Sequence, residues 1–301
     1  MKKNSKILVT GVAGFIGSKV CEELQRNKFS VIGVDDLSSG KKKNIPKNIT
    51  FYNFDLSNYQ NYKKLPKCKY ILHLAGQSSG DISFDNPVED LKKNTQSTLN
   101  LIRFGIKSKT KKIVYASSMS VYGDLDKNKY DENMQSQPKS CYGVSKLASE
   151  NYLKIFSKKI NYINFRMFNV YGPGQDLSNL RQGMVSIFLA QALKNKKIKV
   201  RGSLNRIRDF IYIDDVVKIW VKSLNSNIYN QTINLSSGEP TSVKKLLNEI
   251  KLLLPGTKII KASSTRGDQF RAVGNAKKLN KIFKHKFTSL RIGLNKFLKS
   301  I

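Results

Sequence analysis

The sequence predicts an α/β fold in which helices cover both faces of a parallel β-sheet. Short apolar runs of strand length recur through the first 170 residues, and segments with the i, i+3, i+4 spacing of amphipathic helices lie between them. Strands that alternate with helices in this way are typical of parallel sheets joined by right-handed crossovers. A glycine-rich turn directly after the first apolar run agrees with this arrangement, because there a strand would lead at once into a helix.

The elements of this first region follow one another in a regular order. The first strand is expected at Ile7–Thr10, and the helix after it carries apolar spacing from Ser18 to Arg26. A third strand is expected just before Asp55. The other strands are expected at Val31–Asp35, Tyr70–Leu74, Ile113–Ala116 and Asn161–Phe168, with helices over 88–107 and 142–157.

The rhythm of the pattern changes after residue 171. A helix over 184–194 and a strand over 197–201 are followed by a strand at Phe210–Ile213, a helix from about Asp214, and a strand at Thr232–Leu235 that returns to the large sheet. Helix, strand, loop and helix follow from residue 241. We therefore expect a larger domain of residues 1–170 with about 206–238, and a smaller α/β domain of about 171–205 with 239–301.

The composition is strongly basic, with 54 lysines and arginines against 21 acidic residues and a net charge of +33. Such a charge favours polyanionic partners. Arginine, however, supplies only ten of the 54 basic residues, and the lysines are spread from Lys2 to Lys299 instead of forming one stripe among aromatic residues. We expect a solvated lysine-rich surface and no dedicated nucleic-acid partner. A basic scaffold or polyanion-binding protein remains the non-enzymatic alternative.

The cysteines and the apolar segments bear on the compartment. The chain has three cysteines, Cys21, Cys68 and Cys141, and no C-x-x-C motif. This odd number predicts neither a disulfide framework nor a metal site, and it fits a reducing cytoplasm. The basic start followed by apolar residues 7–17 resembles a signal peptide, but charged residues follow at once and no small-residue cleavage pattern is present. No run approaches 18 apolar residues, so we expect no membrane span.

The glycine-rich turn reads T-G-x-x-G-x-x-G between a predicted strand and a predicted helix. The first glycine permits the tight turn, the second lets the backbone approach a pyrophosphate, and the third lets the helix pack against the strand. The amino terminus of the helix attracts the phosphates. We expect a dinucleotide to contact this turn at Gly11, Gly14, Phe15, Ile16 and Gly17.

Two acidic positions are expected near the adenosine half of that dinucleotide. Asp35 ends the second strand 18 residues after Gly17, where a carboxylate accepts hydrogen bonds from the ribose hydroxyls and repels a 2′-phosphate. NAD is therefore favoured over NADP, although the run Lys41–Lys43 could tolerate a phosphate. Asp55 and Leu56 follow the third strand and are placed to meet adenine, but an aspartate there is equally typical of a turn or helix N-cap.

A phenol and an ammonium group are spaced Tyr-x-x-x-Lys at Tyr142 and Lys146, and Ser118 lies upstream of them. Residues four apart lie on one helix face, so Lys146 could hold Tyr142 as a phenolate at neutral pH and make it a base for an alcohol. Lowering the pKa from about 10 to about 7 corresponds to about 4 kcal/mol. The spacing also occurs in exposed helix turns, so this interpretation depends on the dinucleotide-binding turn.

These features together resemble the extended short-chain dehydrogenase/reductase family, in its branch of NAD-dependent nucleotide-sugar epimerases and dehydratases of the UDP-glucose 4-epimerase type. The segments that carry the resemblance occur in the family's order: the glycine turn, Val34–Leu37, His73–Gln77, Ser117–Gly123, Tyr142–Lys146, Arg166–Pro173 and Arg208–Phe210. The resemblance implies an enzyme with a Rossmann-type, NAD-binding larger domain and a smaller domain that binds a nucleotide-diphosphate sugar. It also implies roles in nucleotide-sugar metabolism and polysaccharide biosynthesis.

The resemblance implies roles for individual residues. The catalytic residues would be Ser118, Tyr142 and Lys146, of which Tyr142 and Lys146 would also contact NAD. The dinucleotide would further be lined by Leu74, Ala75, Gly76, Asn94 and Phe168. The substrate would be bound by Ser118, Asn169, Arg208 and Arg266. The planar fork of Arg208 suits a diphosphate, whereas a salt bridge to Asp209 or Asp215 is the alternative.

The sequence departs from the family pattern at three places. Cys141 stands where the family often has proline, and Arg266 is one residue out of step in its motif. Met119 and Ser120 stand where 4,6-dehydratases place an Asp-Glu pair, and the cysteine of 3,5-epimerase/4-reductases is also missing there. Elimination of water needs an acid and a base at such positions. Epimerisation is therefore favoured over the dehydratase and reductase alternatives.

The implied mechanism is a transient oxidation. Tyr142 would take the proton of a sugar hydroxyl while hydride passes from the same carbon to NAD, and hydride would return to the other face of the keto sugar. Lys146 would bind the nicotinamide ribose and Ser118 would orient the hydroxyl. The family resemblance also implies a homodimer through the helices over 88–107 and 142–157. We expect the second of these helices to present Leu147 and Leu153.

Overall fold

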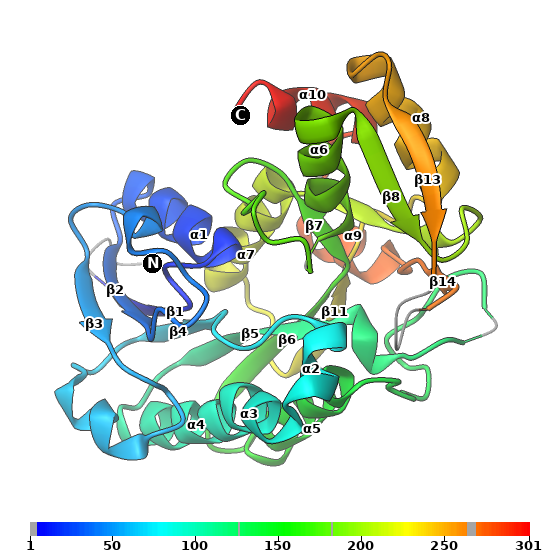
Figure 1. The fold of residues 1–301 in the computed structure, drawn as a ribbon. Helices are drawn as coiled ribbons and strands as arrows, with labels where there is room; N and C mark the ends of the chain where they lie inside the picture. The colour runs from blue at the N-terminus through cyan, green and yellow to red at the C-terminus, as the bar shows by residue number, and fades with distance from the viewer. Residues whose placement is uncertain (1–4, 126, 182, 264–268) are drawn as a thin grey trace.

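The computed structural model describes residues 5–125, 127–181, 183–263 and 269–301. Its centre is a seven-stranded parallel sheet with the strand order β11-β6-β5-β4-β1-β2-β3 (Figure 1). The strands are β1 (Lys6–Thr10), β2 (Ser30–Asp35), β3 (Thr50–Asn53), β4 (Tyr70–His73), β5 (Lys112–Ser118), β6 (Asn161–Met167) and β11 (Gln231–Leu235). The predicted α/β class is confirmed, because the order reverses between β1 and β4 as in Rossmann-type sheets.

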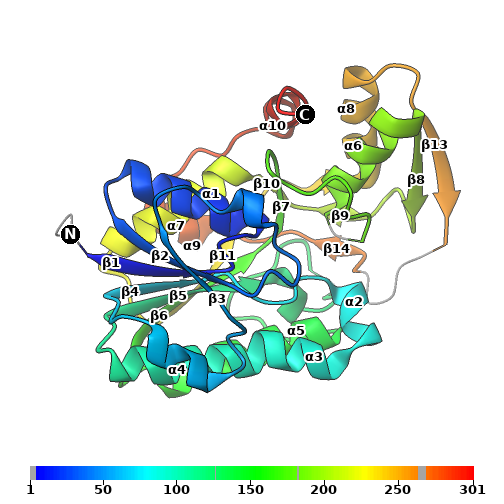
Figure 2. The same cartoon turned by 60° about the vertical axis from the view of Figure 1, so that its left-hand side comes forward.

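Helices cover both faces of this sheet (Figure 2). Alternation along β1 explains the two cores, since Ile7 and Val9 join the buried cluster on one face and Leu8 joins the cluster on the other. The first face carries α1 (Phe15–Arg26), α7 (Ile213–Asn225) and α9 (Lys277–Phe283); the second carries α3 (Pro87–Leu91), α4 (Ser97–Lys107) and α5 (Cys141–Ile155). Both faces are therefore shielded, as buried parallel strands require.

The segment predicted as one helix over 88–107 is interrupted. Between α3 and α4 lies a π-helical turn, η3 (Lys92–Gln96), in which Asn94 and Thr95 are buried. The hydroxyl of Ser97 donates to the carbonyl of Lys93, and that of Thr98 donates to the carbonyl of Asn94. These bonds give backbone carbonyls of the wider turn a hydrogen-bond donor. The shorter elements of the region are α2 (Gly80–Asp85), η1 (Lys42–Asn44), η2 (Tyr59–Lys64) and η4 (Met119–Val121).

The second half of the chain adds small sheets above the carboxyl edge of the large one. β7 (Asn169–Tyr171) pairs with β10 (Phe210–Tyr212), and β8 (Lys197–Arg201) pairs with β13 (Lys258–Ala262). A third small sheet contains β9 (Ile207–Arg208), β12 (Thr241–Ser242) and β14 (Arg271–Ala272), and the helices there are α6 (Met184–Asn195), α8 (Val243–Leu253) and α10 (Leu290–Leu298). Figure 1 shows α6, α8, β8 and β13 grouped together beside the large sheet.

None of the helices in the described ranges combines the length and the apolar character that crossing a bilayer requires.

Candidate active site

The predicted site residues gather at the carboxyl ends of β1, β4 and β5. Gly11 follows β1, the segment 74–76 follows β4, and Ser118 is the last residue of β5. The strand order reverses between β1 and β4, and open α/β sheets bind ligands in the crevice at such a reversal. The topology therefore brings these separate segments to one place.

The glycine turn forms a cradle that no larger residue could form. Gly11 has a φ of +73°, and a Cβ placed on it would lie 2.7 Å from the backbone nitrogen of Ala75. A Cβ on Gly17 would lie 2.0 Å from the carbonyl oxygen of Gly11. Gly14 is the N-cap of α1 and offers no capping side chain, so the first N–H groups of the helix remain for a ligand, with Phe15 and Ile16 beside them. This turn fits a pyrophosphate.

Asp35 holds the end of β2 against the glycine turn. Its carboxylate oxygens accept hydrogen bonds from the backbone N–H groups of Ala13, at 2.9 Å, and Leu37, at 2.8 Å. Burial raises the pKa of Asp35, and these two bonds oppose that shift. Each oxygen keeps a further lone pair that a ribose hydroxyl could use. Asp35 thus already shapes the turn that is predicted to receive the dinucleotide.

A buried relay that sequence reasoning missed fixes the loops after β1 and β4. Thr10 Oγ1 accepts from the N–H groups of Leu74 and Ala75 at 3.2 Å, so its own proton points to His73 Nδ1, 2.8 Å away. His73 Nε2 then donates to Thr98 Oγ1 at 3.0 Å. Burial lowers the pKa of His73 to about 3, which keeps the ring neutral. The signal was present, since Thr10 and His73 are the first residues of two of the motifs named above.

The structure brings Ser118, Tyr142 and Lys146 together in a buried group. Ser140 caps α5 by accepting from the N–H of Gly143, and the helix then presents both predicted residues on one face. Tyr142 is 8% exposed and Lys146 is 4% exposed. Lys146 Nζ lies 5.6 Å from the centroid of the Tyr142 ring.

The residues around Tyr142 do not by themselves lower its pKa, so its ionisation in the predicted mechanism also needs the positive nicotinamide. Burial raises the pKa of Tyr142 to about 12, and the hydrogen bond with Ser118 only partly opposes the shift. Burial also lowers the pKa of Lys146 to about 8, against the attraction of Asp90. For each group the loss of hydration outweighs the favourable interaction with its partner, Ser118 for Tyr142 and Asp90 for Lys146, so Lys146 does not by itself convert the phenol to a phenolate.

Asn94 meets Lys146 at Gly76, which has a φ of +144°. A Cβ on Gly76 would lie 2.3 Å from Asn94 Oδ1 and 3.5 Å from Lys146 Nζ. Asn94 Nδ2 donates to Asp90 Oδ1 at 3.1 Å, whereas Asn94 Oδ1 is buried without a hydrogen-bond partner among the described residues. A buried acceptor without a donor calls for an explanation, and a ligand with a donor group would supply one. The glycine turn and the unpaired Asn94 Oδ1 thus fit a dinucleotide.

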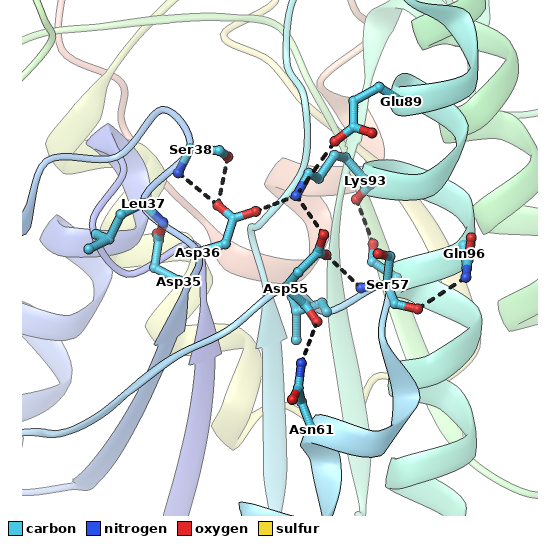
Figure 3. A network of polar contacts seen from close by, with 12 residues as sticks. Asp35, Asp36, Leu37, Ser38, Asp55, Ser57, Asn61, Glu89, Lys93 and Gln96 are labelled. Atoms are coloured by element: carbon cyan, nitrogen blue, oxygen red, sulfur yellow. Dashed lines mark hydrogen bonds and ion pairs between the residues drawn. The ribbon is translucent and has the colours of Figure 1, made fainter.

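Asp55 and Leu56 follow β3, and Asp55 lies beside Lys93 (Figure 3). Asp55 Oδ1 accepts from the N–H of Ser57 at 2.8 Å, so the turn role is present, and Asp55 Oδ2 lies 2.9 Å from Lys93 Nζ. The Leu56 side chain is buried in the core under the sheet. Contact of Asp55 and Leu56 with adenine stays a prediction.

The predicted substrate residues stand on the side of the small sheets. Asn169 Nδ2 donates to the carbonyl of Asp209 at 3.0 Å, and Phe168 is buried in a cluster with Tyr122 and Tyr130. The guanidinium of Arg208 is buried and donates to backbone carbonyls, those of Gln269, Ile207 and Phe270. Arg266 lies outside the described residues.

The carboxylates considered as alternative partners of Arg208 are held elsewhere. Asp209 accepts from the Ser237 hydroxyl and from backbone N–H groups, and Asp215 accepts from His285 and from the N–H of Thr288. The bonds that Arg208 makes to carbonyls fix it next to the segment that leads into β14.

Comparison with known proteins agrees with this geometry. The sequence profile described as "NAD dependent epimerase/dehydratase family" matches residues 7–236. The chain is 38% identical over 250 residues to a Methanocaldococcus jannaschii protein named "Putative UDP-glucose 4-epimerase", with 81% of each chain covered. Among solved structures it is similar to UDP-glucose 4-epimerase from Thermotoga maritima with UDP-glucose (TM-score 0.94, 32% identity, 98% of both chains). It is also similar to UDP-glucose 4-epimerase from Thermus thermophilus in complex with NAD (TM-score 0.90, 28% identity, 98% of both chains). The chain belongs to the NAD-dependent epimerase/dehydratase family.

Proposed function

We propose that this protein is a nucleotide-sugar epimerase of the UDP-glucose 4-epimerase type. The observation that carries the proposal is the buried group of Ser118, Tyr142 and Lys146 beside the glycine cradle, with Met119 and Ser120 following Ser118. Bound NAD supplies a reversible hydride acceptor and, when oxidised, a positive charge near the phenol. The chain's own residues supply the proton transfer and hold the sugar in place.

Tyr142 is the proton carrier of the proposed reaction. Once the phenol has released its own proton to solvent, its Oη accepts the proton of a sugar hydroxyl that Ser118 Oγ orients, and it returns that proton when the keto sugar is reduced. Because the pKa of Tyr142 lies at about 12 in the protein alone, Tyr142 holds its proton until further positive charge adds to that of Lys146. Asn169 and Arg208 are proposed to bind the diphosphate, as is Arg266.

The residues after Ser118 favour epimerisation over dehydration. Ser120 Oγ accepts from Ser118 Oγ at 3.2 Å, and Met119 Sδ accepts from Asn169 Nδ2 at 3.7 Å. Neither residue can protonate a leaving hydroxyl group as a carboxylic acid does. A keto sugar formed here would be reduced again instead of losing water.

Substitution of Tyr142 tests the proposal. The purified protein is incubated with UDP-, GDP-, CDP- and dTDP-sugars, and we expect an epimer of one of them without accumulation of NADH. Y142F should lower turnover by at least about a thousandfold, within the range that proton-transfer catalysis supplies, while bound NAD remains. Y152F, which removes a hydroxyl from the same helix, is the matched control. Net reduction, loss of water, or turnover by Y142F close to that of Y152F would contradict the assignment.

We further propose that the chain forms a homodimer through α3 and α5. The exposed apolar side chains on these helices support it, since Val88, Leu91, Val144 and Ile155 are each more than half exposed. Leu153, expected on this surface, is instead fully buried, and Leu147 is partly buried. A reducing compartment such as the cytoplasm is proposed because all three cysteines are free.

Sedimentation equilibrium tests the dimer. The double substitution of Leu91 and Ile155 by glutamate should yield a monomer, because it places charges in the proposed apolar contact. L252E introduces the same charge at an exposed leucine of α8 and should leave the dimer intact. A monomeric native protein, or a dimer that survives the double substitution, would exclude this surface.

A further inference from the structure

Lys93 connects three segments of the chain at the far end of the proposed NAD site (Figure 3). Its Nζ makes an ion pair with Asp36 Oδ2, lies 2.9 Å from Asp55 Oδ2, and lies 3.7 Å from Glu89 Oε1. Asp36 follows β2, Asp55 follows β3, and Glu89 stands one turn earlier on α3. The Lys93 side chain is only 18% exposed, so this is not an ordinary surface pair.

Each aspartate is oriented by its own loop before Lys93 reaches it. Asp36 Oδ1 accepts from the N–H of Ser38, at 2.9 Å, and from the Ser38 hydroxyl. Asp55 Oδ1 accepts from the N–H of Ser57 at 2.8 Å. The second oxygen of each carboxylate is the one that meets Lys93. One ammonium group therefore ties together two loops whose carboxylates are already fixed.

The electrostatics of the three groups agree with a formed ion pair. Partial burial raises the pKa values of Asp36 and Asp55, but the hydrogen bonds from Lys93 and the backbone outweigh it and lower both. Burial lowers the pKa of Lys93, and the two carboxylates outweigh that effect and raise it. All three groups stay charged across the physiological pH range.

Through the π-helical turn, one short segment contacts both the loop after β4 and the loops after β2 and β3. Lys93 and Asn94 are neighbours within η3. Asn94 Oδ1 approaches Gly76, next to Lys146, whereas Lys93 Nζ reaches the loops after β2 and β3. Single π-helical turns inside α-helices are frequently found at functional sites.

We propose that Lys93 is a latch that closes the adenosine end of the NAD site and sets how slowly NAD leaves it. The inference rests on the proposed NAD-binding function, in which Asp35 takes the ribose and Asp55 meets adenine. Asp36 directly follows Asp35, so Lys93 joins the two loops that carry the residues predicted to contact the adenosine. An open polar cavity of about 600 Å³, lined by Asp55, Glu89, Lys92 and Gln96 among others, borders the latch.

The latch suits an enzyme that regenerates NAD within each catalytic cycle. Such an enzyme gains nothing from rapid exchange of the cofactor, and a slow dissociation rate keeps it ready for the next substrate. A lysine is adequate for this role because its ammonium group can meet several carboxylates at once.

Release of NAD from the loaded protein tests the latch. Protein saturated with radiolabelled NAD is passed over a desalting column and chased with unlabelled NAD, and the loss of label is followed. K93M should release NAD at least about tenfold faster, which corresponds to about 1.4 kcal/mol. K92M removes the same charge from the exposed neighbouring residue, and its release rate should equal that of the native protein.

Salt dependence separates a latch from a merely structural lysine. Raising sodium chloride to about 1 M shortens the screening length to about 3 Å, which stabilises the separated, solvated charges of the open state relative to the ion pair, so native release should accelerate more than release from K93M. D36N should also accelerate release. K93R keeps a positive charge that can reach both carboxylates, so NAD release from K93R should be as slow as from the native protein. If K93M does not fold, D36N and the native salt dependence decide the matter.

The outcomes distinguish the latch from the function on which it rests. A native protein that binds no NAD would overturn the proposed function. A native protein that binds NAD, combined with a K93M release rate and salt dependence equal to those of the native protein and K92M, would overturn the latch alone. If K93M does not fold, the latch would be overturned by two results together: NAD release from D36N as slow as from the native protein, and native release that does not change with salt.

Discussion

Lys146 is kept charged at neutral pH at a cost to the stability of the fold. Burial lowers its pKa to about 8 from the ordinary value of 10.5. The unfolded chain therefore binds more protons than the folded chain between pH 8 and 10.5, and the free energy of unfolding rises with pH through that window. Below the window, the charged Lys146 destabilises the folded protein by about 3 kcal/mol.

Removal of this charge should stabilise the cofactor-free protein while it abolishes activity. K146M should raise the free energy of unfolding by up to about 3 kcal/mol near pH 7, and the gain should shrink by that amount as the pH approaches 10.5. Urea unfolding at a series of pH values measures it. K154M, an exposed lysine of the same helix, should show no such pH-dependent difference. If K146M lowers the free energy of unfolding near pH 7, or changes it by the same amount at every pH, the charged Lys146 does not destabilise the fold as stated.

The elements differ in how far the sequence could predict them. The strands at Ile7–Thr10, Tyr70–Leu74 and Ile113–Ala116 were predicted to within a few residues, because a strand buried on both faces is a continuous apolar run. The helix α1 begins at Phe15 instead of near Ser18, because Gly14 at its N-cap and Gly17 in its first turn interrupt the apolar spacing. Apolar spacing indicates which residues are buried. It does not predict an element whose start depends on backbone conformation.

The region of α3, η3 and α4 shows what the sequence could not provide. The run Glu89–Lys93 is mostly charged and would be typical of a solvated helix face, yet Asp90 is buried against Asn94 and Lys93 is held by carboxylates from two distant loops. Those partners come from tertiary contacts between segments far apart along the chain. The position of Tyr142 was predictable from spacing, whereas its raised pKa depends on burial that only the folded chain produces.

At the scale of the whole molecule, buried polar groups join the large sheet to the small ones. The Asp209 carboxylate accepts from the N–H groups of Ser237 and Gly238, which follow β11, and from that of Gly274, which follows β14. Tyr130 exchanges backbone hydrogen bonds with Val273 and Asn275 in the same region. The proposed substrate residues are thereby fixed relative to the sheet that carries the proposed catalytic ones.

The ion pair between Arg166 and Glu150 anchors α5, and with it Tyr142 and Lys146, to this framework. Arg166 Nη2 lies 2.7 Å from Glu150 Oε2, Arg166 Nη1 donates to the carbonyl of Glu132 at 3.2 Å, and both charged side chains are buried. E150Q leaves the Arg166 charge buried without its counterion, so we expect it to lower the free energy of unfolding by about 3–5 kcal/mol. Urea denaturation of the purified protein measures the loss.

A double substitution separates the role of the charges from that of packing. Replacement of both Glu150 and Arg166 by methionine removes the unpaired charge as well as the pair, so it should recover most of the stability that E150Q loses. R291M breaks the contact, 4.0 Å long, between the exposed Arg291 and the partly buried Glu249, and should cost less than about 1 kcal/mol. An E150Q loss no larger than that of R291M, or a double variant as unstable as E150Q, would show that α5 is held by its apolar contacts instead of by this buried pair.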